Sequence, residues 1–525
     1  MSAERFRDRP FLAVPSRQSE AWGVPREMRY GDVLGRVNAL RAQYHERGLQ
    51  PGDRLALAFE SRPEYVFHYL ALNALGVAVV PLNTDLTPPE LAYQLAHSGS
   101  RALICLPSLA PLLAAAIQVT GRETPLSSTG PQGLPADRRA PRADTPADPR
   151  QRVAAILYTS GTTGRPKGCV LSNTYLLETA AYNACLPGEI AIAEGTERIL
   201  NPLPLYHMNS MVSTVGAAIL TGSCFVVPGR FSATHWWEDL AETQATRFNY
   251  LGIMIPALLA QPESPRDLDH GIRHAFGAGV DPALHERFEQ RFGIALMEVW
   301  GMTETGRFLI VDREPRMIDT RACGRPLAGL EARIVNEAGD PLPDGETGEL
   351  VVRHSEAAPR HGFFSGYLDD PSATEAAWAG GWFHSGDLCQ RSPDGMFFFV
   401  DRRKNIVRRS GENISAAEVE AALSASPQVA QVAVLAVPDA LRDEEVLACV
   451  VPAAGCAPDA ALARSLHVFT ATRLAYFKTP GWIRFVDALP ITGTQKVQKH
   501  MIFPEGFSPG LPGMHDLREQ KRWKK

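Results

Sequence analysis

Helical and strand patterns of hydrophobic residues alternate along the first 120 positions. Helical spacing relates Val33, Val37, Leu40 and Tyr44. Residues 55–59 and 77–82 are short apolar runs, which are typical of strands buried on both faces. Such alternation predicts a parallel sheet covered by helices.

The pattern changes further along the chain. Between residues 121 and 150, Pro, Gly, Ser, Thr and charged residues replace the apolar periodicity, so we expect a mobile loop there. Residues 153–157 then read as another buried strand, and the hydroxyl-rich stretch Tyr158–Gly168 follows it directly. The end of such a strand is where α/β sheets bind ligands.

The last quarter of the chain has the pattern of a small α+β domain. Residues 416–423 are spaced as a helix, with Ser415 at its N-cap and Glu418 at the N3 position of a capping box. Residues 431–437 and 447–451 are apolar runs typical of strands. We expect this domain to close over the preceding one as a lid.

Length and composition agree with more than one domain. A chain of 525 residues exceeds what one hydrophobic core usually supports. Hydrophobic residues make up 45% and charged residues 21%, as in an ordinary globular enzyme. The 53 Lys and Arg against 58 Asp and Glu give a net charge of −5, which offers no basis for a nucleic-acid partner.

Cysteine usage and the N-terminus predict a cytoplasmic protein. The eight cysteines are dispersed, mostly among apolar neighbours, with no pair at metal-ligand spacing, so we expect reduced thiols in the core. The N-terminus has no apolar signal region, and no run of eighteen apolar residues predicts a membrane span. A homodimer is one of the assemblies that we consider.

The stretch Tyr158–Gly168 has the chemistry of a polyphosphate site. Its glycines let the backbone approach an anion, its hydroxyl groups can donate hydrogen bonds, and Lys167 adds a mobile positive charge. It is not the P-loop of nucleoside triphosphatases, because that pattern requires Gly directly before its Lys, where Pro166 stands here. A flexible surface turn would explain a five-residue fragment of this kind, but not all eleven residues.

This loop resembles the signature loop of the adenylate-forming superfamily, which comprises acyl-CoA synthetases, amino-acid adenylation domains and beetle luciferases. Further motifs of that family follow in the order that the family has. The sequence from Met396 to Ser415 is most similar to the carnitine and crotonobetaine type of CoA ligase. The resemblance implies an α/β fold, with a large N-terminal domain of layered sheets and helices and a small mobile α+β C-terminal domain. It implies ATP, Mg²⁺ and coenzyme A as cofactor and co-substrates.

The resemblance also sets the domain boundaries. The family places its hinge at the position of Lys404. We therefore expect an AMP-binding domain over residues 1–401, a hinge over 402–405, a lid domain over 406–510 and a basic tail over 511–525. We expect the tail to be frayed from Arg518 onward.

The family motifs assign a nucleotide site by position. Trp300 stands where the family usually has a Tyr that packs on adenine, and Asp387, expected in a tight turn, matches the residue that accepts the ribose hydroxyls. The implied ATP- and AMP-binding residues are Thr159, Ser160, Gly161, Thr162, Thr163, Gly164, Lys167, Gly277, Ala278, Gly279, Val299, Trp300, Gly301, Met302, Thr303, Asp387 and Arg402.

Four residues match catalytic positions of the family. Thr303 would meet the α-phosphate, and Glu304 is a hard oxygen ligand suited to Mg²⁺. His207 lies in a segment that Pro204 keeps from regular structure, and its family counterpart gates the phosphate side. The fourth position, that of the adenylation lysine, is matched by Lys496.

The small domain carries residues for both halves of the implied reaction. The family has Gly directly before its adenylation lysine, whereas Gln495 stands there in this chain, so Lys499 is a second candidate. After rotation about the hinge, the segment 408–412 would face the adenylate and form the tunnel for the thiol. The coenzyme A-binding residues implied there are Arg408, Gly411 and Glu412.

The sequence does not specify the acid. The candidate acyl pocket mixes polar and apolar residues, namely Tyr206, His207, Asn209, Met211, Asn249, Tyr250, Gly252, Val280 and Arg307. Arg307 would either bind a second carboxylate, and so select a dicarboxylic acid, or face solvent as exposed arginines do. Residues 231–234 lack the Asp with which amino-acid-activating relatives hold the substrate ammonium, which argues against an amino acid.

The resemblance implies a reaction in two halves. A small or medium carboxylic acid attacks the α-phosphorus of MgATP to give an acyl-adenylate and pyrophosphate, and a thiol then displaces AMP. Coenzyme A is the simplest acceptor, since we expect no attached carrier domain, and a stand-alone enzyme that loads an acyl carrier protein is the alternative. A luciferase-type oxygenase and a degenerate nucleotide-binding protein are hypotheses from other classes.

Overall fold

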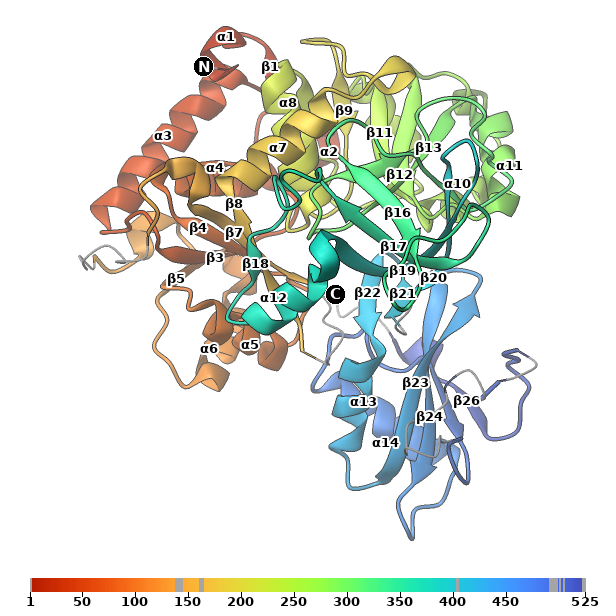
Figure 1. Cartoon of the computed structure of the whole chain (residues 1–525). Helices are drawn as coiled ribbons and strands as arrows, with labels where there is room; N and C mark the ends of the chain where they lie inside the picture. Colours follow the sequence, from red (N-terminus) through yellow and green to blue (C-terminus); the bar gives the residue numbers. More distant parts are fainter. Residues whose placement is uncertain are drawn as a thin grey trace.

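The computed structural model of this protein describes residues 2–136, 145–159, 165–402, 406–490, 499, 502–503 and 506–521, without the side chains at 401, 402, 406, 413, 415 and 417. Within this part of the chain, three sheets build a large N-terminal domain, and a fourth sheet builds a small C-terminal domain that lies beneath it in Figure 1. The α/β fold class predicted from the sequence is confirmed.

The first sheet is the predicted helix-covered sheet. Its order is β18-β8-β7-β4-β3-β5-β6, in which β7 to β6 are parallel and β8 and β18 add an antiparallel edge. The strands are β3 (Arg54–Ala58), β4 (Ala78–Pro81), β5 (Ala102–Cys105), β6 (Leu126–Ser127), β7 (Val153–Thr159), β8 (Lys167–Ser172) and β18 (Gly366–Tyr367). The apolar runs of the sequence therefore fall on β3, β4 and β7 as predicted, and the predicted loop 121–150 is interrupted by β6.

Amphipathic helices accompany this sheet. They are α3 (Tyr30–Glu46), α4 (Pro63–Leu75), α5 (Pro88–Ser98), α6 (Ala110–Thr120) and α7 (Asn173–Ala184). The helix predicted from apolar spacing is α3, which buries Val33, Val37 and Tyr44. Capping residues set the start of α5, where the carboxylate of Glu90 accepts the backbone N–H of Thr87.

The second sheet has the order β14-β13-β12-β11-β9-β10-β1-β2 and is parallel from β13 to β1. Its strands are β1 (Pro10–Ala13), β2 (Glu27–Arg29), β9 (Arg198–Leu200), β10 (Cys224–Val226), β11 (Arg247–Leu251), β12 (His274–Ala278), β13 (Ala295–Gly301) and β14 (Phe308–Ile310). The accompanying helices are α1 (Ser2–Arg5), α2 (Ser16–Trp22), the π-helix η5 (Asn209–Val215), α8 (Gly216–Thr221), α9 (Trp236–Glu242), α10 (Met254–Leu259) and α11 (Pro282–Phe292). One hydrophobic cluster includes Phe11 of this sheet and Leu55 of the first, so the two sheets share a core.

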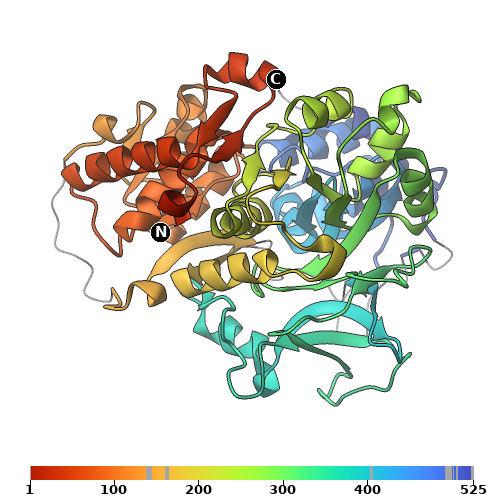
Figure 2. The ribbon, with the colours of Figure 1, turned by 90° about the horizontal axis from the view of Figure 1, so that it is seen from above.

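The third sheet is antiparallel, has the order β15-β20-β19-β17-β16, and forms a separate layer of the large domain in Figure 2. Its strands are β15 (Ala322–Gly324), β16 (Glu331–Val335), β17 (Gly348–Arg353), β19 (Phe383–Arg391) and β20 (Phe397–Arg402), with helix α12 (Pro371–Ala377) nearby. The expected tight turn at Asp387 is wrong, because Asp387 lies within β19. Gly386, at φ +73°, bends that strand with a shift of register, so the turn-like sequence is accommodated without ending the pairing.

The small domain contains the predicted helix and strands. Its sheet has the order β22-β21-β24-β25-β26, with β23 paired to β24, and α13 packs on β23. The elements are β21 (Ile406–Arg409), β22 (Glu412–Ser415), α13 (Ala416–Ser424), β23 (Val429–Asp439), β24 (Asp443–Pro452), α14 (Ala460–Ala471), β25 (Trp482–Phe485) and β26 (Met514–Asp516). The side chain of Ser415, the predicted N-cap, lies outside the described residues.

The expectation of a frayed tail from Arg518 is wrong for residues 518–521. Arg518 forms ion pairs with Asp439 at 2.8 Å and Asp516 at 2.7 Å, and Lys521 is buried against Glu445. Strand β26 also carries the sheet of the small domain past residue 510. The basic side chains order this segment because they meet acidic partners, which composition alone does not reveal.

Two further expectations are met in part. All eight cysteines are free, and six are buried, but Cys185 is exposed and Cys456 is half-buried. Among the helices that the structure describes, none is long and apolar enough to cross a membrane.

Candidate active site

One cavity of about 810 Å³ lies where the two domains meet. It collects residues from β7, β8, the loop before η5, β12, β13, β19 and the connection between β21 and β22. The residues predicted from the sequence that line it are Thr159, Lys167, His207, Asn209, Ala278, Val299, Gly301, Met302, Thr303, Glu304, Arg307, Asp387, Gly411 and Glu412. Residues up to 253 positions apart in the chain therefore face a common space, as the order of motifs predicted.

Several predicted residues cannot be placed. Lys404, the expected hinge, and Lys496, the expected adenylation lysine, lie outside the described residues. The same holds for Ser160, Gly161, Thr162, Thr163 and Gly164 of the predicted phosphate loop and for the side chain of Arg402. Lys499, the second lysine candidate, pairs with Glu420 of α13 at 2.7 Å.

Glu304 is a buried carboxylate held by two hydroxyl groups. It is 6% exposed, and its Oε1 accepts hydrogen bonds from Thr159 at 3.4 Å and from the Tyr367 hydroxyl at 3.2 Å. The Nζ of Lys167 lies 4.7 Å from the centre of the Tyr367 ring, over its face. Tyr367 thus contacts both the ammonium group of Lys167 and the carboxylate of Glu304.

Sequence reasoning missed Tyr367. It lies on the two-residue strand β18, which pairs with β8 and so brings the ring beside the end of the phosphate loop. No periodic pattern or family motif marks this segment, and its contacts within the site, with Glu304 and Lys167, are with residues 63 and more positions away. Only the pairing of β18 with β8 reveals its place.

The residues present fit a magnesium ion that arrives on the nucleotide. Among the described residues there is no group of three or more His, Cys, Asp or Glu side chains that could hold a metal by itself. Mg²⁺ does not require one, because it is commonly bound by one or two carboxylates together with phosphate oxygens and water. Glu304 is the side chain that would hold such an ion, as the sequence predicted.

Trp300 anchors Asp387. Its indole Nε1 donates a hydrogen bond of 2.8 Å to Oδ2 of Asp387, and both side chains are buried. Trp300 itself is packed in the core behind the cavity, whereas Gly301 and Val299 line the cavity. Asp387 also stands opposite Arg402 in the pairing of β19 with β20, so the backbones of the two residues predicted at the ribose are neighbours.

His207 faces the cavity from the loop that precedes η5, as predicted. Its ring is exposed to the space of the cavity, but the surrounding protein keeps it from bulk water and lowers its pKa to about 4. The ring is therefore neutral near pH 7. Tyr206 packs beside it, with ring centres 4.6 Å apart, and does not line the cavity.

The wall of the cavity near the predicted acyl site contains a network of amides. Oδ1 of Asn209 accepts hydrogen bonds from Asn201 and Asn249, each of 3.0 Å, and Thr214 accepts from the same two donors. Asn249 lies behind this wall at 2% exposure. The network holds Asn209, the amide that reaches the cavity, in one position.

Further predicted residues do not line the cavity. They are Tyr250, Gly252 and Val280 of the predicted acyl pocket and Gly277 and Gly279 of the predicted nucleotide site. The Tyr250 hydroxyl donates to Glu298 at 2.6 Å, and the backbone N–H of Gly279 donates to the same carboxylate at 2.8 Å. Burial raises the pKa of Glu298 to about 7, and sequence reasoning missed this residue because a single acidic residue in a strand has no distinguishing signal.

Arg307 lines the cavity but does not face solvent. It is 3% exposed and pairs with Glu178 at 3.0 Å, and it also donates to the backbone carbonyl of His361 at 3.0 Å. The expectation of a solvent-facing side chain is wrong, because α7 and the segment around His361 cover the guanidinium group. Glu178 already balances the charge that a second substrate carboxylate would need.

The small domain contributes the loop from Ser410 to Glu412. Gly411, at φ +85°, lies so close to the large domain that a Cβ would stand 2.5 Å from Cδ1 of Leu251. Burial and the charge of Asp85 raise the pKa of Glu412 to about 7. Arg408 does not line the cavity; its guanidinium lies over the Phe399 ring at 4.4 Å.

Comparison with known proteins agrees with this geometry. The family described as "AMP-binding enzyme" matches residues 1–368, and its C-terminal domain matches residues 418–496. A crotonobetaine/carnitine–CoA ligase of Salmonella paratyphi A is 32% identical over 514 residues, 95% of this chain and 96% of that protein.

Two solved structures are similar over nearly their whole length. An o-succinylbenzoate CoA synthetase from Bacillus subtilis is 25% identical with a TM-score of 0.82, covering 96% of this chain and 98% of that one. An amide bond synthetase from Marinactinospora thermotolerans is 26% identical with a TM-score of 0.81, covering 95% and 98%.

Proposed function

Because this chain belongs to the family of AMP-binding enzymes, as an AMP-forming acyl-CoA ligase, we propose that it joins a small or medium carboxylic acid to coenzyme A. ATP would be cleaved to AMP and pyrophosphate. The observation that carries the proposal is that Gly411 and Glu412 of the small domain line the same cavity as Glu304 and Asp387 of the large one. A nucleotide site closed by a second-domain loop is the arrangement that a two-step transfer needs.

The first half-reaction forms an acyl-adenylate. A carboxylate oxygen of the acid attacks the α-phosphorus of ATP, an O–P bond forms, and the bond to pyrophosphate breaks. Lys167 and Thr303 line the cavity where they can stabilise phosphate oxygens, and Glu304 would hold the Mg²⁺ that neutralises phosphate charge when bound. Neutral His207 can donate a hydrogen bond without adding a charge beside the carboxylate.

The second half-reaction forms the thioester. The thiol sulfur attacks the acyl carbon, a C–S bond forms, the C–O bond to AMP breaks, and the thiol proton passes to water. The loop 410–412 lies against Leu251 at the cavity, the position from which it would guide a thiol to the adenylate. The structure therefore has the domain arrangement that suits this second step.

The cavity favours an acid with a polar group. Asn209 and Ser213 stand on the wall beside Met208 and Phe308, so the acid would meet an amide and a hydroxyl as well as apolar surface. A similar relative is a crotonobetaine/carnitine–CoA ligase, and short acids with a polar or cationic end are consequently the first to test.

The test is pyrophosphate release from MgATP over short, branched, aromatic, betaine and dicarboxylic acids, each with and without coenzyme A. One acid should release pyrophosphate, and coenzyme A should turn a single burst into steady turnover. Absence of release with every acid would contradict the proposal. A burst that coenzyme A leaves unchanged would point to another acceptor.

A second acceptor class is included because one similar solved structure is an amide bond synthetase. Primary amines replace coenzyme A in a parallel set of reactions. Steady turnover with an amine but not with coenzyme A would assign amide formation instead.

A further inference from the structure

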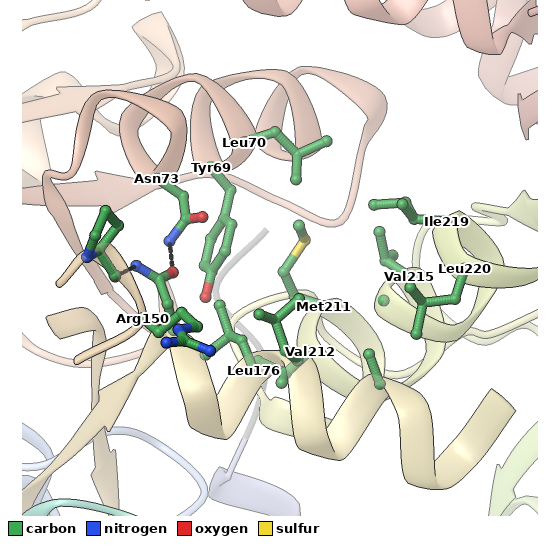
Figure 3. Close-up of a pocket in the computed structure, with 15 residues that line it drawn as sticks. Tyr69, Leu70, Asn73, Arg150, Leu176, Met211, Val212, Val215, Ile219 and Leu220 are labelled. Carbon is green, nitrogen blue, oxygen red and sulfur yellow. Dashed lines mark hydrogen bonds between the residues drawn. The ribbon is translucent and has the colours of Figure 1, made fainter. Parts of the chain in front are cut away.

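A second cavity, of about 350 Å³, lies in the large domain between helices α4 and α7 and the segment formed by η5 and α8 (Figure 3). None of its lining residues lines the first cavity. We propose that it binds a small amphiphilic monocarboxylic acid, with the apolar chain inside and the carboxylate toward Tyr69 and Arg150. This site does not depend on the proposed function.

The wall of the second cavity is largely apolar. It is formed by Leu70 of α4, Leu176 of α7, and Met211, Val212, Val215 and Ile219 of η5 and α8. Its volume falls within the range of about 300–1,000 Å³ that is usual for small-molecule sites. Such a wall would receive an alkyl chain or an aromatic ring.

Exposed leucines surround this cavity. Leu177 is 53% and Leu220 is 36% exposed, although both are large aliphatic side chains. A bound apolar chain would remove part of this surface from water, which is favourable. The exposure therefore favours a ligand that reaches from inside the cavity to its mouth.

A buried hydroxyl group supplies the polar contact. Tyr69 is 3% exposed, and its hydroxyl has no hydrogen-bond partner among the described residues. In Figure 3 the Tyr69 ring extends from α4 with its hydroxyl toward Arg150 and Leu176. A buried hydroxyl without a partner is unfavourable, and an acceptor atom of a ligand would remove this cost.

The positive charge of Arg150 favours an anionic ligand over a neutral one. Its side chain is 74% exposed and pairs with Asp148 at 3.3 Å, an exposed contact of little strength. A guanidinium group has five N–H donors, so it can also bind a carboxylate at the polar end of the cavity. The Asn73 amide, which donates to Asn173 at 2.8 Å, lines the same end.

The π-helix η5 separates the two cavities. Asn209 and Ser213 line the first cavity, whereas Met211 and Val212 line the second. Sequence reasoning placed Met211 in the acyl pocket, but its side chain belongs to the second cavity, because residues two apart on a helix point to different sides. An acid bound here would touch the element that also forms a wall of the active site.

The test is calorimetric titration of the full chain with octanoate. We expect binding with a Kd of about 1 mM or tighter. The variants Leu176→Trp and Leu220→Trp, which fill the cavity and its mouth, should each weaken it at least tenfold. Ala278→Trp, which fills the first cavity instead, should leave one octanoate bound.

Two further comparisons test the polar end. Tyr69→Phe and Arg150→Gln should each weaken octanoate binding about fivefold, and octan-1-ol should bind less tightly than octanoate. Thermal melting identifies any variant that fails to fold. Leu220→Trp is the variant least prone to misfolding, because Leu220 is exposed.

Three results would overturn the proposal. They are no binding of octanoate by the wild-type protein, loss of all binding in Ala278→Trp, and unchanged binding in both Leu176→Trp and Leu220→Trp. Equal affinity for octan-1-ol would overturn the assignment of a carboxylate.

Discussion

At the scale of single residues, Trp300 contributes a hydrogen bond to the carboxylate of Asp387 in addition to its packing in the core. Its indole N–H holds Oδ2 of Asp387 at 2.8 Å in a buried setting. A Tyr at this position, as in the usual family pattern, would carry its polar atom at a different place on the ring. The Trp therefore fixes the orientation of the carboxylate expected at the ribose.

Trp300→Phe should raise the KM for ATP about tenfold with little change in kcat, because a hydrogen bond to a charged group contributes about 1.5–3 kcal/mol. Steady-state kinetics with the acid identified by the panel measures this. Trp236→Phe is the matched control, since Trp236 is buried and its indole N–H has no partner among the described residues. An equal KM change in both variants would mean that lost packing is the cause.

The residues of the cavity that could be named from the sequence lie in contiguous motifs. Thr303, Glu304 and Asp387 could be named because each lies in a short string with a family counterpart, and the structure brings all three to one cavity. Tyr367 and Glu298 could not, because their roles arise from contacts between strands that are distant in the sequence. The assigned roles of all these residues stay predictions.

At the scale of elements, the C-terminal segment is part of the small domain. Lys521 and Arg409 both contact Glu445, which is fully buried. Arg409 directly precedes the loop 410–412 of the cavity. Lys521 thus supports, through Glu445, the strand from which that loop extends.

Lys521→Met should lower the free energy of unfolding of the small domain by about 3 kcal/mol, because it leaves a buried carboxylate with one partner fewer. Urea unfolding of the full chain, followed by hydrogen exchange in β24 and β25, measures this. Arg518→Met, which removes two ion pairs whose arginine side chain is 41% exposed, should cost less than about 1 kcal/mol. Equal effects would contradict a special role of Lys521.

Element prediction succeeded where the apolar pattern was uninterrupted. The elements α3, β3, β4, β7, β23 and β24 all lie where apolar spacing placed them. It failed at β19, where Gly386 gives a turn signal inside a strand that pairs on both edges, and at the tail, where ordering comes from distant acidic partners. The π-helical form of η5 also has no sequence signal.

At the scale of the whole molecule, the surroundings of Glu412 predict that the contact between the domains depends on pH. Burial, followed by the charge of Asp85, raises the pKa of Glu412 to about 7, whereas the same carboxyl in water would have its ordinary pKa near 4.5. Between these values the closed arrangement binds more protons than one with Glu412 in solvent. The closed arrangement is therefore favoured at low pH and loses this advantage as pH rises through 7.

Scattering or fluorescence transfer between the domains should show less closure at pH 8.5 than at pH 6. The Glu412→Gln variant mimics the protonated carboxyl and should remove this dependence. Asp85→Asn should only lower the midpoint, because burial is the larger cause. A wild-type profile that is flat over this range would contradict the prediction.

The same contact between domains is held by a buried triad of charges. Nζ of Lys478 in the small domain lies 2.8 Å from Glu90 of α5 in the large domain and 2.9 Å from Glu418 of α13. Burial alone would lower the pKa of Lys478, but the two carboxylates outweigh the effect of burial and raise this pKa. Lys478 is therefore protonated whenever the domains adopt this arrangement.

Lys478→Met should separate the two half-reactions. Without the ammonium group two carboxylates would be buried side by side, so the arrangement that brings the loop 410–412 to the cavity becomes less stable by about 3 kcal/mol or more. Thioester formation from supplied acyl-adenylate should fall at least tenfold. Pyrophosphate release in the first half should change less than about twofold, because the domain alternation implied by the family uses a different arrangement of the small domain for that half. Arg518→Met, whose ion pairs lie within the small domain, should change neither half. Equal losses in both halves of Lys478→Met would mean that the triad stabilises the fold as a whole rather than one arrangement of its domains.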